Sequence, residues 1–185
     1  MEFIEVDYMR RQIRRNVFET NSSSMHSLVI KKNGDYYTED ELRKHLWLMQ
    51  NNVWEIWNED NLEFGRYPFN CLETFESKVR YAIASLCGYR KDAVERFKEI
   101  EKVVLEVIPE CIGIKLPEDE WNDEVSYGYV DEDILSPFLK AEDISLKEFL
   151  TNKKYVVIVD GDEYCIWNSL KDSGLVNIDE IEKEY

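Results

Sequence analysis

The stretch Tyr155-Val156-Val157-Ile158-Val159 is almost continuously apolar and rich in β-branched residues, and Asp160-Gly161 follows it directly. A run of this length that ends in a turn dipeptide predicts a buried strand entering a tight hairpin. The return strand is expected over residues 163–167, where aromatic and aliphatic residues dominate again.

A second hairpin is predicted at Asn33-Gly34, because both residue types tolerate positive φ. Its strands are expected over residues 27–32 and 35–37. Thr38 then opens a helix with a capping-box pattern, and Asn51-Asn52 is expected to end that helix.

Two longer helices are predicted over residues 75–87 and 92–108, since apolar residues recur there at helical spacing. The stripe of the first helix is formed by Phe75, Val79, Ile83 and Leu86. The stripe of the second is formed by Val94, Phe97, Ile100, Val104 and Ile108. Gly88 is the expected stop of the first helix, and Asp92 is the expected cap of the second.

A further strand is predicted over residues 112–116, and a short helix is predicted over 145–151 with Ser145 as its cap. Hairpins and helices alternate without a regular strand–helix–strand rhythm. This order predicts an α+β fold whose sheet is mostly antiparallel and covered by the two central helices. We expect one domain, residues 1–185, with an acidic insertion or lobe at about 117–150.

The composition of the 185 residues excludes several classes of protein. With 44% hydrophobic and 13% aromatic residues, the chain can bury a sizeable core. Its four cysteines are scattered, which argues against a zinc ribbon or a dense disulfide framework. The first residues do not have the layout of a signal peptide, and no apolar run reaches the length of a membrane helix. We therefore expect a soluble protein of the cytoplasm.

Charge is the strongest compositional signal. The chain has 23 basic and 39 acidic residues, a formal net charge of −16. Such a surface repels free nucleic acid and attracts basic surfaces, so little affinity for free DNA or RNA is expected. The most direct partner class is a protein that itself holds DNA or RNA. The alternative is that the acidity only confers solubility.

The acidity peaks in residues 117–150, which contain 11 acidic and 2 basic residues. Aromatic side chains stand among these charges, a combination that favours a protein interface over a plain solvated surface. The residues expected to bind a partner are Glu118, Asp119, Glu120, Trp121, Asp123, Glu124, Tyr127 and Tyr129.

A polar block at residues 19–25 directly precedes His26 and the first predicted strand. Hydroxyls beside an imidazole are typical of a phosphate site or an activated nucleophile. The same residue types also make ordinary turns, because they bond their own backbone. In the site interpretation the catalytic candidates are His26, Ser22, Ser23, Ser24 and Glu19. The phosphate-binding candidates are Arg14, Arg15, Thr20 and Asn21. No metal or cofactor is expected, since two histidines are too few for most metal sites.

Residues 16–30, N-V-F-E-T-N-S-S-S-M-H-S-L-V-I, resemble an N-terminal signature of small proteins from phages and mobile elements of Firmicutes. That signature reads F-E-T-N-S-S-S-x-H-S and is followed by an apolar strand. The group is similar to some type II-A anti-CRISPR proteins, which disable Cas9. The resemblance implies an anti-defence protein that binds Cas9 or its guide-RNA complex, whose channels are positively charged.

Two alternatives to this inhibitor remain. One is an enzyme, such as a metal-independent nuclease, that acts on guide RNA through residues 19–26. The other is a phage structural or accessory protein. The sequence does not predict the oligomeric state.

Overall fold

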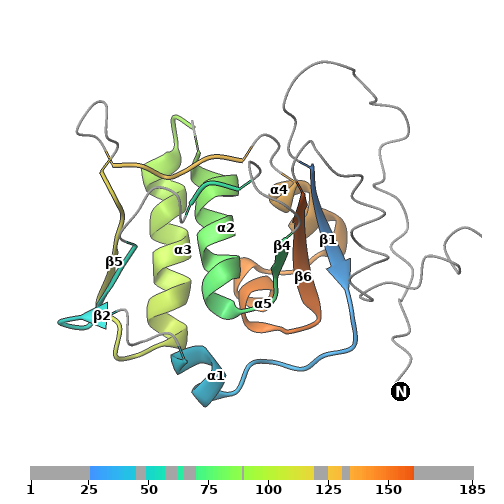
Figure 1. Cartoon of the computed structure of the whole chain (residues 1–185), viewed down its shortest axis with the longest axis horizontal. Coiled ribbons are helices and arrows are strands. Elements are labelled where there is room, and N and C mark those ends of the chain that lie inside the picture. The colour runs from blue at the N-terminus through green and yellow to red at the C-terminus, as the bar shows by residue number, and fades with distance from the viewer. Residues whose placement is uncertain are drawn as a thin grey trace, which may run out of the picture.

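The protein has an α+β fold, as predicted (Figure 1). The computed structural model describes residues 26–44, 49–56, 62–64, 70–88, 90–118, 125–130 and 134–160. The helices in these ranges are α1 (Glu39–Arg43), α2 (Phe75–Cys87), α3 (Ala93–Val107), α4 (Leu135–Glu142) and α5 (Leu146–Thr151). The strands are β1 (His26–Lys31), β2 (Met49–Gln50), β3 (Val53–Glu55), β4 (Asn70–Leu72), β5 (Gly113–Lys115) and β6 (Tyr155–Asp160).

The described strands form two sheets. The first has the order β1-β6-β4 and is antiparallel throughout. In the second, of order β2-β3-β5, β3 pairs antiparallel with β2 and parallel with β5. The strand predicted over 112–116 therefore exists as β5, but the expectation that it joins the sheet of β1 and β6 is wrong. Helices α2 and α3 lie on the chain between β3 and β5, and a helical crossover of this kind joins parallel strands.

Helix α2 is the centre of the fold, because it lies with α3 between the two sheets (Figure 1). Eleven of its 13 residues are buried, including the predicted stripe and much of the opposite face. Helix α3 buries only one face, on which Ile100 and Val104 are fully covered. Val94 is 50% exposed, contrary to its predicted place on that face.

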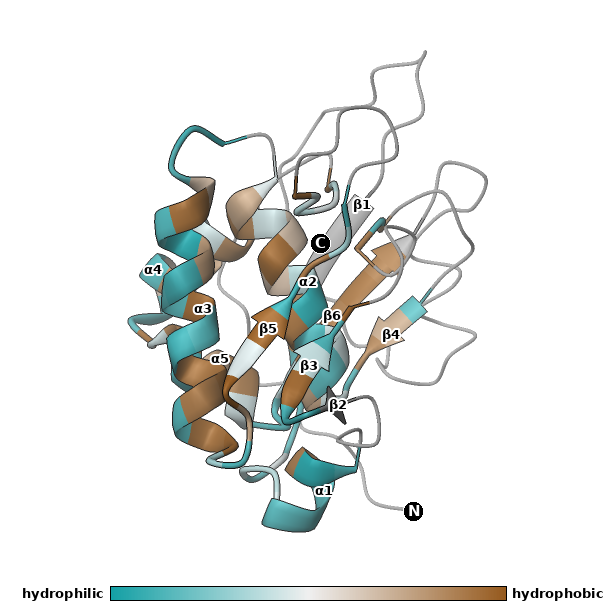
Figure 2. Ribbon diagram, turned by 90° about the vertical axis from the view of Figure 1, so that its left-hand side faces the viewer, coloured by the Kyte–Doolittle hydropathy of each residue, from teal (hydrophilic) through white to brown (hydrophobic). Residues whose placement is uncertain are grey.

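The acidic window contributes to the same core. Helices α4 and α5 lie within it, and their Leu135, Phe138, Phe149 and Leu150 are buried in the cluster that surrounds α2. Strand β6 is hydrophobic along most of its length, whereas α1 is largely hydrophilic (Figure 2). Among the helices of the described ranges, none has the length and apolarity that crossing a bilayer requires.

Asn33-Gly34 does not form the predicted hairpin. Strand β1 pairs with β6 instead. The two segments stay paired beyond Lys31 and Tyr155, up to a bridge between Tyr36 and Asn152. The register shifts by two residues over this stretch, so Asn33 and Gly34 form a bulge in one ladder. Neither residue has the positive φ that a tight hairpin turn requires.

The tight turn lies at Asn51-Asn52, which was expected to end a helix. Helix α1 already ends at Arg43, and Asn51-Asn52 joins β2 to β3. Their φ angles are 54° and 64°, as a two-residue hairpin turn demands. The return strand predicted over 163–167, after Asp160-Gly161, lies outside the described residues.

The two central helices begin in different ways. Thr74 Oγ1 accepts a hydrogen bond from the Ser77 N–H at 3.1 Å, and Ser77 Oγ accepts one from the Thr74 N–H at 3.1 Å. This reciprocal pair fixes the start of α2. Asp92 precedes α3, but its carboxylate makes no capping bond and instead binds Arg96 Nε at 2.7 Å. Asp92 therefore occupies the predicted N-cap position, but its side chain does not make the expected capping bond.

We expect Thr74→Ala to lower the free energy of unfolding by about 1 kcal/mol, because the Ser77 N–H loses its capping acceptor. Asp92→Ala is the matched control, and its effect should be much smaller, since exposed ion pairs contribute little. Urea denaturation of both variants measures the difference. Equal losses would show that the capping bonds do not stabilise α2.

Candidate functional site

The structure fixes only the strand end of the predicted His26 site. His26 is the first residue of β1, and its register partner is Asp160, the last residue of β6. The predicted polar loop and the predicted Asp160-Gly161 turn therefore adjoin the same end of the sheet. The other residues of this candidate site, between Arg14 and Ser24, lie outside the described part of the chain.

The acidic window has a fixed anchor in the fold. Glu118 is exposed and bridges Val125 in an antiparallel pair, and the Ser126 N–H donates to the Pro117 carbonyl at 2.9 Å. Residues 119–124, between these paired ends, lie outside the described ranges and include four of the predicted contact acids and Trp121. The two ends of this acidic stretch are thus held together by their pairing with each other.

Residues 125–130, which we call the anchor segment, run across the ends of α2 and α3 (Figure 1). The Tyr127 ring packs edge-on against Phe97, with ring centres 5.9 Å apart. Tyr129 is held by its backbone, since its N–H donates to the Leu62 carbonyl and its carbonyl accepts from the Phe64 N–H. Its side chain remains 42% exposed. Of these two predicted contact residues, Tyr129 therefore offers the larger surface to a partner.

Charge is distributed unevenly between the described ranges and the rest of the chain. The described ranges contain 19 acidic and 16 basic residues, and at least nine of these basic residues form ion pairs. The remaining residues contain 20 acidic and 7 basic ones. Residues 119–124 and 131–133, which flank the anchor segment, contain seven acidic residues and no basic one. The residues that flank the anchor segment thus supply seven of the sixteen net negative charges, whereas the described ranges together have a net charge of −3.

The structure also reveals a buried lysine that the sequence analysis missed. The side chain of Lys78 on α2 is completely buried. Its Nζ donates to the carbonyls of Phe149 and Asn152, each at 2.8 Å, at the end of α5. The ring of Tyr37 lies 4.8 Å from the same nitrogen, and the ring of Phe149 lies at 5.4 Å. Lys78 thus ties the central helix to the C-terminus of α5, where carbonyls attract a cation.

Burial changes the acidity of this group. Removal from water disfavours the charged ammonium, so the pKa of Lys78 falls from 10.5 to about 7, and the nearby charge of Lys32 adds to the shift. Lysines are almost never fully buried without compensation. The sequence shows only a lysine in an amphipathic helix, whereas its burial depends on Tyr37 and α5, which come from distant parts of the chain and are not predicted by local periodicity.

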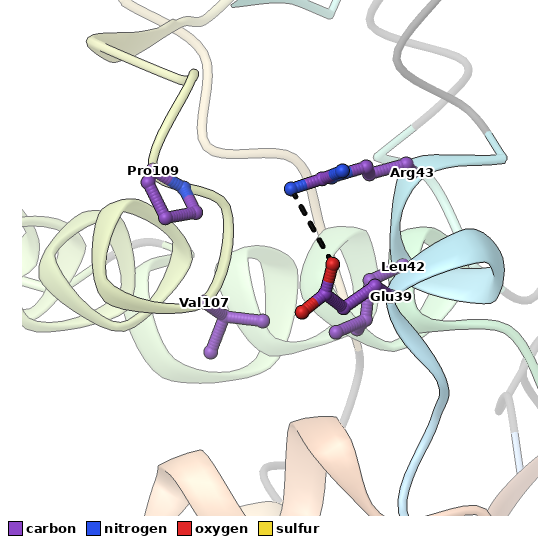
Figure 3. Close-up of a pocket in the computed structure, with 5 residues that line it drawn as sticks. All are labelled: Glu39, Leu42, Arg43, Val107 and Pro109. Carbon is purple, nitrogen blue, oxygen red and sulfur yellow. Dashed lines mark ion pairs between the residues drawn. The ribbon is translucent and has the colours of Figure 1, made fainter.

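A small pocket lies between α1 and the C-terminal end of α3 (Figure 3). Its volume is about 120 Å³, and its lining consists of Glu39, Leu42, Arg43, Val107 and Pro109. Arg43 is bound by Glu110 at 2.9 Å and by Glu39 at 3.7 Å, so the cation at its rim is already paired. The pocket is well below the roughly 300 Å³ of the smallest usual ligand sites. It is not a candidate active site.

Within the described residues, no three His, Cys, Asp or Glu side chains are grouped as a metal site requires. The chain matches no protein-family model, no curated protein and no solved structure. Any functional assignment therefore depends on the arrangement of its own residues.

Proposed function

We propose that this protein is an interaction protein that binds a basic, nucleic-acid-handling effector through the anchor segment and the acidic residues flanking it. The observation that carries this proposal is the separation of charge. A nearly balanced, ion-paired body supports a short surface segment with seven acidic residues at its two ends. The effector implied by the N-terminal resemblance is Cas9 or its guide-RNA complex.

Two features of the anchor segment support this role. Its Val125 and Tyr129 are 52% and 42% exposed, although both are large apolar residues. An aromatic side chain held by a fixed backbone is typical of the residues that dominate binding energy at protein interfaces. Acidic residues around it attract a basic channel over a distance and repel free nucleic acid. The segment thus combines an apolar contact with long-range electrostatic attraction.

The proposal is tested by kinetic binding measurements on immobilised Cas9, with and without guide RNA, at low and moderate salt. The acidic variant converts to amides the residues Glu118, Asp119, Glu120, Asp123 and Glu124. The control variant converts five exposed acidic residues elsewhere, Asp35, Asp40, Glu95, Glu99 and Asp143. Both variants change the net charge equally. We expect the acidic variant to associate about tenfold more slowly at low salt, and the control to associate nearly as fast as the wild type.

Three results would contradict this proposal. The first is the absence of association under every salt and guide-RNA condition. The second concerns the enzyme alternative and uses the guide RNA recovered from the mixtures and resolved on a denaturing gel. Guide RNA that is shortened by the wild type but stays intact with His26→Ala would make the protein an enzyme. An equal loss of association in both variants would show that net charge alone, and not the anchor segment, attracts the effector.

A further inference from the structure

The buried Lys78 is covered by a short piece of backbone. Residues 32–37, which we call the strap, connect β1 to Thr38, the N-cap of α1. Three backbone hydrogen bonds hold the strap to the chain between α5 and β6. The Lys32 N–H donates to the Lys154 carbonyl at 2.8 Å, and the Lys153 N–H donates to the Asp35 carbonyl at 2.8 Å. The Tyr37 N–H donates to the Thr151 carbonyl at 2.9 Å.

Side chains of the strap complete the cover. The Tyr37 ring lies over Lys78 Nζ, and its hydroxyl donates to the Glu73 carbonyl. Lys32 Nζ binds Glu73 Oε2 at 2.8 Å. Glu73 immediately precedes the N-cap of α2, so this ion pair holds the start of the strap to the start of that helix. The strap itself is exposed from Asn33 to Tyr36. Tyr37 packs against the core, but the exposed residues 33–36 oppose local opening with few apolar contacts, in contrast to the packed α2 beneath them.

We propose that the strap is a pH-sensitive cover, which opens locally to admit water to Lys78 at a cost set by the protonation of that lysine. In the closed state the amine is enclosed by Tyr37, Phe149 and two backbone carbonyls. In the open state it gains water on the side of Tyr37. Because the charged form gains far more from water than the neutral form, protonation favours opening.

The direction of the pH effect follows from linkage. Closed Lys78 has a pKa of about 7, and solvated Lys78 has its ordinary value of 10.5. Between these two values, opening takes up a proton. The opening equilibrium constant therefore falls as pH rises, by about tenfold per pH unit well inside the window and about fiftyfold from pH 7 to pH 9. Below pH 7 both states are protonated, and the dependence disappears.

Two neighbouring groups, Tyr37 and Cys71, do not account for this pH dependence, because neither changes its protonation near neutral pH while the strap is closed. Burial, followed by the negative charges of Glu73 and Glu41, raises the pKa of the Tyr37 hydroxyl, so Tyr37 stays neutral. Burial, with Glu73 adding to it, raises the pKa of the Cys71 thiol to about 12.

Two ion pairs border the same cluster. Lys32 binds Glu73, and Lys153 binds Glu41 at 2.9 Å. The hydrogen bond from Lys153 lowers the pKa of Glu41 to about 2, so that carboxylate is ionised throughout the window. Lys78 is the group in this cluster whose protonation changes on opening near neutral pH.

Amide hydrogen exchange of the full-length chain, resolved by NMR at pH 7 and pH 9, tests the proposal. After correction for intrinsic exchange rates, the Tyr37 and Lys153 amides should open about fiftyfold less often at pH 9. The Ile112 amide, which precedes β5 and donates to the Asn52 carbonyl in the turn between β2 and β3, is the internal control and should not change. The strap amides should also be less protected than the Ile83 amide in α2, since their opening is local.

Variants separate the lysine from the strap. Lys78→Met should abolish the pH dependence of strap opening. Tyr37→Phe keeps the ring but loses the bond to the Glu73 carbonyl, so it should increase opening about fivefold at both pH values. Should Lys78→Met fail to fold, the side-chain nitrogen of Lys78 can be titrated by NMR in the wild type, with an expected midpoint near 7.

Three results would overturn the proposal. The first is equal strap protection at pH 7 and pH 9 in the wild type. The second is an unchanged pH dependence in Lys78→Met. The third is a Lys78 midpoint near its ordinary value, which would mean that closing the strap does not disfavour the charged form.

Discussion

Gly128→Ala is expected to lower the free energy of unfolding by about 2 to 5 kcal/mol. Gly128 has a φ of 73°, in the left-handed region that costs other residues roughly 1 to 2 kcal/mol. A Cβ at this position would lie 2.3 Å from Leu62 Cβ and 2.4 Å from the Leu62 carbonyl oxygen. Leu62 is completely buried, so relief of this overlap requires a shift of the core, at a further 1 to 3 kcal/mol or so.

Gly113→Ala is the matched control for this substitution. Gly113 lies in β5 without a positive φ, and the nearest atom to its added Cβ would be Glu101 Oε1 at 3.6 Å, an ordinary contact. Its substitution should change stability by less than about 0.5 kcal/mol. Urea denaturation followed by fluorescence measures both variants. A loss below about 1 kcal/mol for Gly128→Ala would mean that the anchor segment can move away from Leu62 with little resistance.

Helix positions could be predicted because their signals are local. The apolar stripe at residues 75–87 is a pattern within one short segment of the chain, and α2 has the predicted bounds. The Ser145 cap was predicted in the same way, and its Oγ accepts from the Glu148 N–H at 3.1 Å. Signals of this kind do not depend on the rest of the chain.

Turn dipeptides were less informative, because they indicate where a turn is allowed but not which strands pair. Asn33-Gly34 and Asn51-Asn52 both suit a tight turn, and only the second forms one. The pairing of β1 with β6 decides the first case, since a long ladder that buries Val29 against Val157 is preferred to a two-residue hairpin. That ladder joins residues more than a hundred positions apart, which local patterns do not specify.

In the candidate site, too, local features could be predicted from the sequence and tertiary contacts could not. Acidity around residues 118–133 is a property of composition and could be predicted from the sequence. The different environments of Tyr127 and Tyr129 could not, because they depend on the contact with Phe97 in α3. Lys78 is the extreme case, since nothing in its neighbours along the chain distinguishes it from the exposed Lys102. Its burial exists only once Tyr37 and α5 pack over it.

Lys78→Ala is expected to lower the free energy of unfolding by about 3 to 5 kcal/mol at pH 9. The substitution leaves a cavity beside Tyr37, and it removes the hydrogen-bond donor of the buried Phe149 carbonyl. Lys102→Ala on the exposed side of α3 is the control, and it should change stability by less than about 0.5 kcal/mol at any pH.

The loss caused by Lys78→Ala should be about 2 kcal/mol smaller at pH 7 than at pH 9. Between the folded pKa of about 7 and the unfolded value of 10.5, unfolding of the wild type takes up a proton, so its stability rises with pH. The alanine variant lacks this contribution, and subtracting its stability removes the effects of other titrating groups. Urea denaturation at pH 7, 8 and 9 measures the difference. A loss that is the same at all three pH values would mean that the two carbonyls stabilise the ammonium enough to cancel its desolvation, and Lys78 would then be a charged, pH-independent link between α2 and α5.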